Sequence, residues 1–182
     1  MKHQFLHNFI TDLKVELLDE FDKNFERKAF FDQPWENTKM PNRRGSLMMR
    51  SGALRRSIRA TSNDTSIRFM SSLPYAEIHN EGGVITVTEK MKKYFWAMYY
   101  KNSNAIRYDV KTKSAVYDAR AQKLTREAAF WKKMALKKVG SKIKVEQRQF
   151  IGPHREVDQC VERVFDRSMK EFEEFIYKTL KK

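Results

Sequence analysis

Cysteine is nearly absent from this chain, which has one, Cys160, in 182 residues. A single thiol excludes an intramolecular disulfide framework and a cysteine-rich zinc site. Long apolar runs are also missing, since no stretch approaches the roughly 20 apolar residues of a membrane-spanning helix. Near the N-terminus, Asn8, Thr11 and Asp12 interrupt the apolar positions, so no secretory leader is predicted. We therefore expect an intracellular protein without a membrane partner.

Residues suited to catalysis are scarce too. His79 and Glu81 have the His-x-Glu spacing of zinc deaminases, but that motif also needs a paired-cysteine segment. Gly82 and Gly83 precede a strand pattern, whereas a phosphate-binding glycine loop opens a helix with Lys and Ser or Thr. We expect no enzyme activity, no cofactor and no metal site. His79 is expected to be a hydrogen-bonded residue that docks a short helix on the sheet, and His154 can cap the last helix.

Two long amphipathic helices are predicted, one towards each end of the chain. Apolar residues recur at intervals of three and four from about residue 3 to 27, and again from Val157 to Leu180. Cys160 falls on the second apolar stripe, where a free cysteine packs as a small core residue. Residues 32–50 contain Pro34, Pro41 and Gly45, which predict a long loop between the first helix and a short helical turn at about 51–57.

The middle of the chain predicts short strands and further helices. Four strand patterns, recognised by alternation or by β-branched content, lie near Ile58, at 67–69, at 84–88 and at 143–145. We expect an α+β fold, with a small antiparallel sheet of about four strands packed with the long N-terminal and C-terminal helices. Residues 1–182 are expected to form a single domain, in which 89–141 is a mainly helical elaboration.

Three short segments, each at a junction between an apolar pattern and a turn signal, are the most informative part of the sequence. They span residues 51–58, 74–83 and 148–153. In this order they resemble the Gly-x-Leu-Arg-x-Ser, Pro-Tyr-Ala-x-x-His and Arg-x-Phe-x-Gly segments of the phage virion morphogenesis family, the Mu-like tail completion or neck proteins. The matching positions are Gly52, Leu54, Arg55, Ser57, Pro74, Tyr75, Ala76, His79, Gly82, Arg148, Phe150 and Gly152. One departure is Glu146, where family members often have proline.

The resemblance implies a structural protein of a tailed phage or prophage that acts in tail completion or head–tail joining during virion assembly. Its implied partners are other tail or neck proteins, and copies of itself in a homo-oligomeric ring. Its implied location is the cytoplasm of the bacterial host during assembly, and then the virion. The matched residues would maintain the fold and the contacts between subunits.

A surplus of basic residues leaves a second function open. The chain has 37 Lys and Arg against 23 Asp and Glu, a formal net charge of +14, and such a field attracts polyanions or acidic protein surfaces. The basic residues singled out as a protein interface or, less favoured, a DNA contact are Arg43, Arg44, Arg50, Arg55 and Arg56. The alternative function is therefore a small basic nucleic-acid-binding module, which would lose affinity steeply as salt rises.

Overall fold

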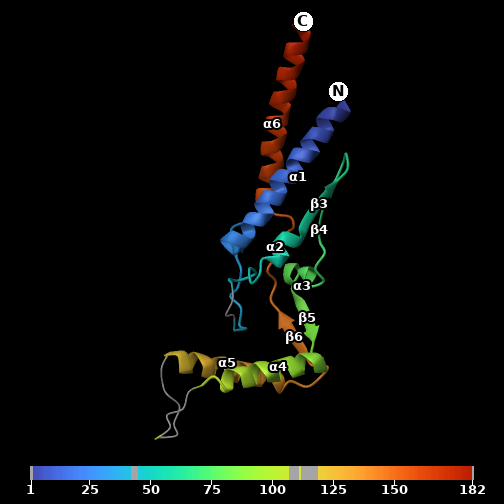
Figure 1. Ribbon diagram of the computed structural model, residues 1–182. Coiled ribbons are helices and arrows are strands. Elements are labelled where there is room, and N and C mark those ends of the chain that lie inside the picture. Colours follow the sequence, from blue (N-terminus) through green and yellow to red (C-terminus); the bar gives the residue numbers. More distant parts are fainter. Residues whose placement is uncertain (1, 42–44, 107–110, 112–118, 182) are drawn as a thin grey trace. The chain divides into compact units, whose positions relative to one another are not determined.

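The computed structural model describes residues 2–41, 45–106, 111 and 119–181 (Figure 1). In chain order the elements are α1 (Lys2–Arg27), β1 (Ala29–Phe30), β2 (Gln33–Pro34), α2 (Ala53–Ser57), β3 (Ile58–Ser62), β4 (Ile67–Ser71), α3 (Ala76–Asn80), β5 (Gly83–Thr86), α4 (Glu89–Ser103), α5 (Ala119–Ala135), β6 (Lys142–Val145) and α6 (Arg155–Leu180). The chain divides into two compact units, the first made of residues 1–37, 44–82 and 146–182, and the second of 38–43 and 83–145.

The long helices α1 and α6 pack side by side and antiparallel in the first unit (Figure 1). The rings of Phe5 and Phe172 lie with their centroids 5.1 Å apart, and those of Phe9 and Phe165 lie 5.7 Å apart, edge to face. These pairs follow from apolar residues at helical spacing on both elements. The two predicted amphipathic helices are thus confirmed, as is the α+β class.

The core of the first unit consists of two apolar clusters. The first joins α1 and α6 with the β1–β2 turn, and its buried members are Leu13, Leu17, Phe21, Phe30, Phe31, Cys160 and Val164. The second joins α1 with α2, α3 and the segment before α6, and its buried members are Phe25, Trp35, Leu54, Ile58, Ala76 and Phe150. The predicted core position of Cys160 is confirmed, since its side chain is 0% exposed.

The strands form three separate antiparallel pairs, β1–β2, β3–β4 and β5–β6. All four predicted strands exist, but within the described residues they do not join in the expected sheet of about four strands. In β3–β4 the partners run from Ile58 opposite Ser71 to Ser62 opposite Ile67, whereas Gly83 of β5 lies opposite Val145 of β6. The alternation of side chains specifies which face a strand buries, but not which strand lies at its edge. Because α3 intervenes after β4, the chain leaves that ladder before β5 begins.

The second unit contains a helical hairpin, in which α4 and α5 pack on each other (Figure 1). Its core is made by Phe95, Trp131 and Ala135, all at most 4% exposed. Thr88 caps α4, because its hydroxyl accepts the backbone N–H of Met91 at 3.2 Å. The stretch 83–145 of the second unit contains residues 89–141, the expected helical elaboration, and also the β5–β6 pair. In the described parts of the chain, no helix is both long enough and apolar enough to cross a membrane.

Candidate functional site

The first family-like segment begins at Gly52 and makes a tight turn into α2. Gly52 has φ 70°, a left-handed conformation that glycine adopts without strain. Leu54 and Ile58 point into the core, at 5% and 8% exposure. The hydroxyl of Ser57 donates to the carbonyl of Leu54 at 2.7 Å and also meets the hydroxyl of Ser71 at 2.7 Å. These contacts tie α2 to the end of β4.

Arg55 of the same segment forms ion pairs with α1. Its Nε lies 2.6 Å from Oδ1 of Asp22, its Nη2 contacts the other oxygen of that carboxylate, and Nη2 also lies 2.7 Å from Oε1 of Glu26. Hydrogen bonding to Asp22, and then to Glu26, raises the pKa of the Arg55 guanidinium. The planar fork of arginine makes this two-point contact, which a lysine cannot reproduce. Arg55 therefore joins α2 to α1.

The other arginines proposed as a contact surface differ from Arg55 in exposure and in hydrogen bonding. Arg56 is exposed, and its Nη2 donates to the carbonyl of Ser51 at 2.9 Å. Arg50 is exposed. Arg43 and Arg44 lie outside the described residues. The internal ion pairs of Arg55 leave Arg50 and Arg56 as the members of this group that a partner can reach in the described part of the chain.

The second segment leads into α3 and carries His79. Pro74 lies just before the helix, Tyr75 is 41% exposed, and Ala76 is buried. The carbonyl of His79 accepts the N–H of Arg148 at 2.7 Å, but its ring Nδ1 is buried and has no hydrogen-bond partner among the described residues. The side-chain hydrogen bond expected for His79 is therefore not formed at Nδ1 by any described residue. Burial, and then the positive charge of Arg148, lowers the pKa of His79.

Gly82 closes this segment where two stretches of backbone approach each other. It has φ 72°, and a Cβ at this position would lie 3.1 Å from the backbone nitrogen of Gln147. A larger residue would push against backbone rather than against a movable side chain end. Gly82 thus permits the backbone of residues 80–82 to pass close to that of residues 147–149.

The third segment, residues 148–152, is held by side chains from three directions. Asn80 accepts the N–H groups of Phe150 and Ile151 at 2.9 and 3.0 Å. Asn24, fully buried on α1, donates to the carbonyl of Phe150 at 3.3 Å. The indole N–H of Trp35 donates to the carbonyl of Gln149 at 2.7 Å. An extended segment without a strand partner thereby has its backbone groups satisfied.

Arg148 and Phe150 are the matched residues of the third segment that have large side chains. Arg148 is 7% exposed, and its Nε donates to the carbonyl of Glu36 at 2.9 Å. Phe150 is 2% exposed and lies against Phe25, with the ring centroids 5.3 Å apart. Gly152 lies at the turn that follows. Most of the matched positions thus make contacts within the first unit, and the fold-maintaining and subunit-contact roles expected for them stay a prediction.

His154 begins α6 as a helix cap, as the sequence allowed. Its Nδ1 accepts the backbone N–H of Glu156 at 3.2 Å, so the other ring nitrogen carries the proton in the neutral form. That Nε2 lies 3.0 Å from Oδ1 of Asp32, and the ring stacks on Phe31 at 4.7 Å. Both ring nitrogens of His154 are therefore engaged by described residues.

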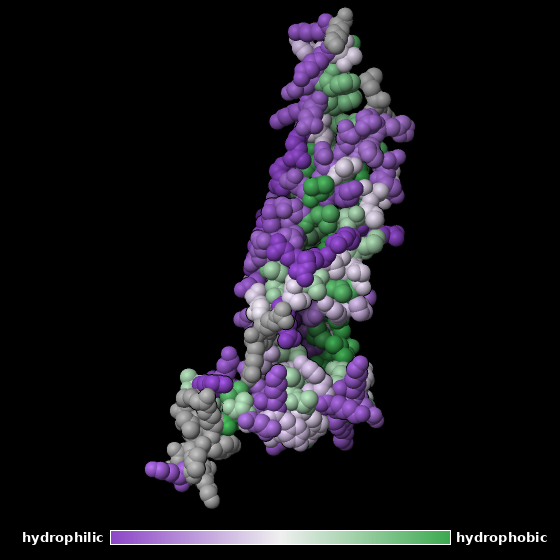
Figure 2. All heavy atoms as spheres, in the orientation of Figure 1, coloured by the Kyte–Doolittle hydropathy of each residue, from purple (hydrophilic) through white to green (hydrophobic). Residues whose placement is uncertain are grey.

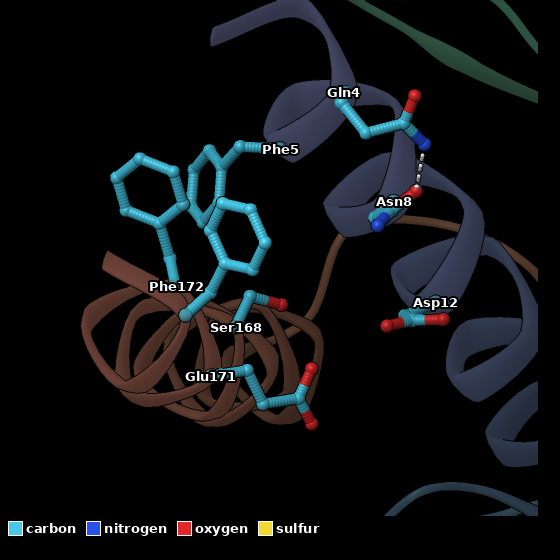
Figure 3. A pocket seen from close by; sticks show the side chains of 8 residues that line it. Gln4, Phe5, Asn8, Asp12, Ser168, Glu171 and Phe172 are labelled. Carbon is cyan, nitrogen blue, oxygen red and sulfur yellow. Dashed lines mark hydrogen bonds between the residues drawn. The ribbon is translucent and has the colours of Figure 1, made fainter. Parts of the chain in front are cut away.

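An open cleft lies between α1 and α6 in the first unit (Figure 3). Its volume is about 380 Å³, and it lies near the start of α1 and the second half of α6. One side is apolar, with Phe5 and Phe172, and the other is polar, with Gln4, Asn8, Asp12 and Glu171. Phe175 also lines the cleft and is 54% exposed. A cleft of this kind suits an apolar side chain or helix of a protein partner.

Ser168 lies at the floor of this cleft and lacks a partner. Its side chain is 6% exposed, and its hydroxyl oxygen has no hydrogen-bond partner among the described residues. Figure 3 shows the hydroxyl directed towards α1, into the gap between the helices. An unsatisfied buried hydroxyl costs about 1–3 kcal/mol, which a polar group of an occupant can recover.

Two observations concern metal binding and thiol reactivity. Among the described residues no group of three or more His, Cys, Asp and Glu could hold a metal ion. The pKa of the Cys160 thiol is raised by burial, which disfavours the reactive thiolate. Comparison of the chain with protein-family models, with curated proteins and with solved structures gives no match.

Sequence reasoning missed two asparagines and one surface. Asn24 and Asn80 hold the third segment, yet neither belongs to the matched motif positions. The surface is the basic face of α4 and α5. The sequence carries a signal for this surface, because Lys123, Arg126, Lys133 and Lys137 recur at helical spacing.

Proposed function

We propose that this chain is a non-enzymatic structural protein of a tailed phage or an integrated prophage, acting in tail completion or head–tail joining during virion assembly. The resemblance of its three segments supports the proposal, and so do their internal contacts, since these residues serve the fold instead of a reaction. Its partners are other tail or neck proteins and copies of itself, in the host cytoplasm and then in the virion.

The α1–α6 cleft is the observation that carries this function. Exposed aromatic side chains lie along the α1-facing side of α6, with Phe165 45% exposed and Phe175 54% exposed. Figure 2 shows green hydrophobic residues along this helix pair, interrupted by purple hydrophilic ones. Apolar surface with a polar rim is the anatomy of a protein–protein interface. A head-to-tail contact, in which the cleft receives a different surface of the next copy, generates a ring when the rotation closes.

Size-exclusion chromatography with light scattering tests this contact on the full chain. We expect a mass above the 21.7 kDa of one chain that falls towards the monomer in Phe175→Ser. Tyr177→Ser is the matched control, because two residues turn a helix by about 200° and place this exposed ring away from the cleft. A strict monomer at high concentration, or equal loss in both variants, contradicts self-assembly through the cleft.

The genes that flank the coding sequence test the wider assignment. Portal, capsid and tail-tube genes are expected beside it, and their absence would contradict a role in virion assembly. Turnover of nucleic acid by the purified protein with a divalent metal would contradict the non-enzymatic assignment.

A further inference from the structure

Nearly all the surplus positive charge of the chain is confined to residues 83–145. This stretch has 16 Lys and Arg against 4 Asp and Glu, whereas the remaining residues have 21 against 19. The helices α4 and α5 contribute most of its described part. Figure 2 shows purple hydrophilic side chains over this hairpin, with pale ones between them. A net charge of +12 on so short a stretch produces a local field far stronger than the chain average suggests.

A line of cations runs along the outward face of α5. Lys123, Arg126 and Lys133 are exposed, and Lys137 just beyond the helix end is half-buried. Their separations of three, seven and four residues place them on one side of a helix. At 1.5 Å per residue the line is about 21 Å long. The buried residues of the helix, among them Leu124 and Trp131, occupy the opposite side.

The outward face of α4 combines cations with aromatic rings. Lys90, Lys93 and Lys101 are exposed, and between them Tyr94 is 50% exposed and Tyr100 is 55% exposed. These five positions share one side of the helix by their spacing, whereas Phe95 is turned into the core of the hairpin. Exposed tyrosines between lysines are the combination that stacks on bases while holding phosphates.

These cations form no ion pairs among the residues that the structure describes. In the described part of the chain, none of the three lysines of α4, nor of the four cations of the α5 line, forms an ion pair. By contrast, Lys23 and Arg27 of α1 both pair with Glu20. Like charges held along one face repel each other, and an anionic ligand spanning several of them relieves that repulsion.

Lysine accounts for 13 of the 16 basic residues in this stretch. This preference for lysine over arginine favours a phosphate-bearing ligand over a protein partner. Protein interfaces are enriched in arginine and depleted in lysine. Lysine is a compact point charge suited to phosphate oxygens. A membrane-surface helix presents a large apolar face to the lipid, whereas here the large apolar residues Phe95 and Trp131 are enclosed between α4 and α5.

We propose that the α4–α5 hairpin is a nucleic-acid-binding surface. The cation line of α5 contacts the phosphate backbone, and Tyr94 and Tyr100 of α4 stack on bases when the ligand is single-stranded. The binding is independent of base sequence, because point charges and ring faces read no base edges. This inference does not depend on the phage assignment or on the α1–α6 cleft.

Fluorescence anisotropy of the full chain tests the proposal, with labelled 25-nucleotide single-stranded DNA and the matching duplex at 50–200 mM NaCl. For four cations on duplex we expect a slope of log affinity against log salt of about −4, and about −3 on a single strand. The variant K123Q/R126Q/K133Q/K137Q should lower affinity at 50 mM NaCl at least tenfold and flatten the slope. Tyr94→Ala with Tyr100→Ala should weaken single-strand binding alone.

The matched control, R68Q/R155Q/K170Q/K178Q, removes the same charge from exposed positions of the first unit. It should retain most of the affinity, and circular dichroism should show both quadruple variants folded. Absence of DNA binding at 50 mM NaCl overturns the proposal, as does an equal loss in both variants, which would indicate net charge alone. Binding to vesicles with 30% phosphatidylserine without binding to DNA overturns it in favour of a lipid surface.

Discussion

The side-chain oxygen of Asn80 accepts the backbone N–H of Phe150 at 2.9 Å, although 70 residues separate them. The same oxygen accepts the N–H of Ile151, and the amide group of Asn80 donates to the carbonyl of Ile151 at 3.0 Å. One side chain thus replaces the strand partner that residues 150–151 lack. It fixes the path of the chain into α6 and keeps Phe150 in the core.

Asn80→Ala should lower the free energy of unfolding by about 2 kcal/mol, because it leaves backbone groups without partners. Asn80→Asp should cost less, since it keeps the accepting oxygen and loses the donor. Urea denaturation followed by circular dichroism measures both. Asn37→Ala, at an exposed position, serves as the control and should change stability by less than about 0.5 kcal/mol. Equal values for Asn80→Ala and the control would contradict the structural role of this side chain.

Arg55→Lys should destabilise the first unit by about 1 kcal/mol, although it conserves the charge. Lysine cannot contact both oxygens of Asp22 while it also reaches Glu26. The exposed Arg56 tolerates the same replacement, with an expected change within about 0.5 kcal/mol. Chemical denaturation of the two variants in parallel makes the comparison. A larger effect at Arg56 than at Arg55 would show that the ion pairs with α1 contribute little.

His79 should make stability depend on pH. Burial, helped by Arg148, lowers the pKa of His79 below its ordinary value of 6.5. The unfolded chain therefore binds a proton at this residue more readily than the folded chain does. This contribution to stability is fully present above pH 6.5 and is lost as pH falls through the folded pKa.

The measurement compares wild type with His79→Gln in urea at pH 7.5 and at pH 5. Wild type should lose more stability than the variant over this interval, because other titrating groups are common to both proteins. A difference between the two proteins that stays constant with pH would show that His79 titrates alike in the folded and unfolded states.

Cys160 should report on the separation of α1 from α6. Its side chain is fully buried, and burial raises the pKa of its thiol, so a thiol reagent reacts only after the helices open. We expect slow labelling in the native state and complete labelling in urea. Val164→Ala, which weakens the same cluster, should accelerate labelling about tenfold for each 1.4 kcal/mol of stability lost. Rapid labelling of the native wild type would contradict the burial.

The sequence predicted the parts of this fold that depend on local periodicity. The stripes of α1 and α6 are long enough to define both helices, and the turn after β3 is closed by Asn63, whose side-chain oxygen accepts the N–H of Ser66 at 2.7 Å. The pairing of strands could not be predicted in the same way. Alternation is identical for a strand that joins a four-stranded sheet and for one that forms a two-stranded ribbon.

The motif positions were predicted as fold-maintaining, but their partners were not. Asn24 and Asn80 sit on helices, where a polar residue carries no signal of the distant backbone it will bind. The hydrogen bond expected for the His79 side chain is likewise not formed at Nδ1 by any described residue. The partner of a side chain is set by tertiary packing, which the local sequence does not specify.

The core of the first unit has a consequence for the order of folding during synthesis. Phe21 on α1 belongs to the same cluster as Val164, and Phe25 packs on Phe150. Translation therefore has to pass residue 164 before these clusters can close, whereas α4 and α5 have both emerged some thirty residues sooner and pair through shorter loops. On the ribosome α4 and α5 should therefore become protease-resistant first, and α1 should become resistant only after α6 has been synthesised.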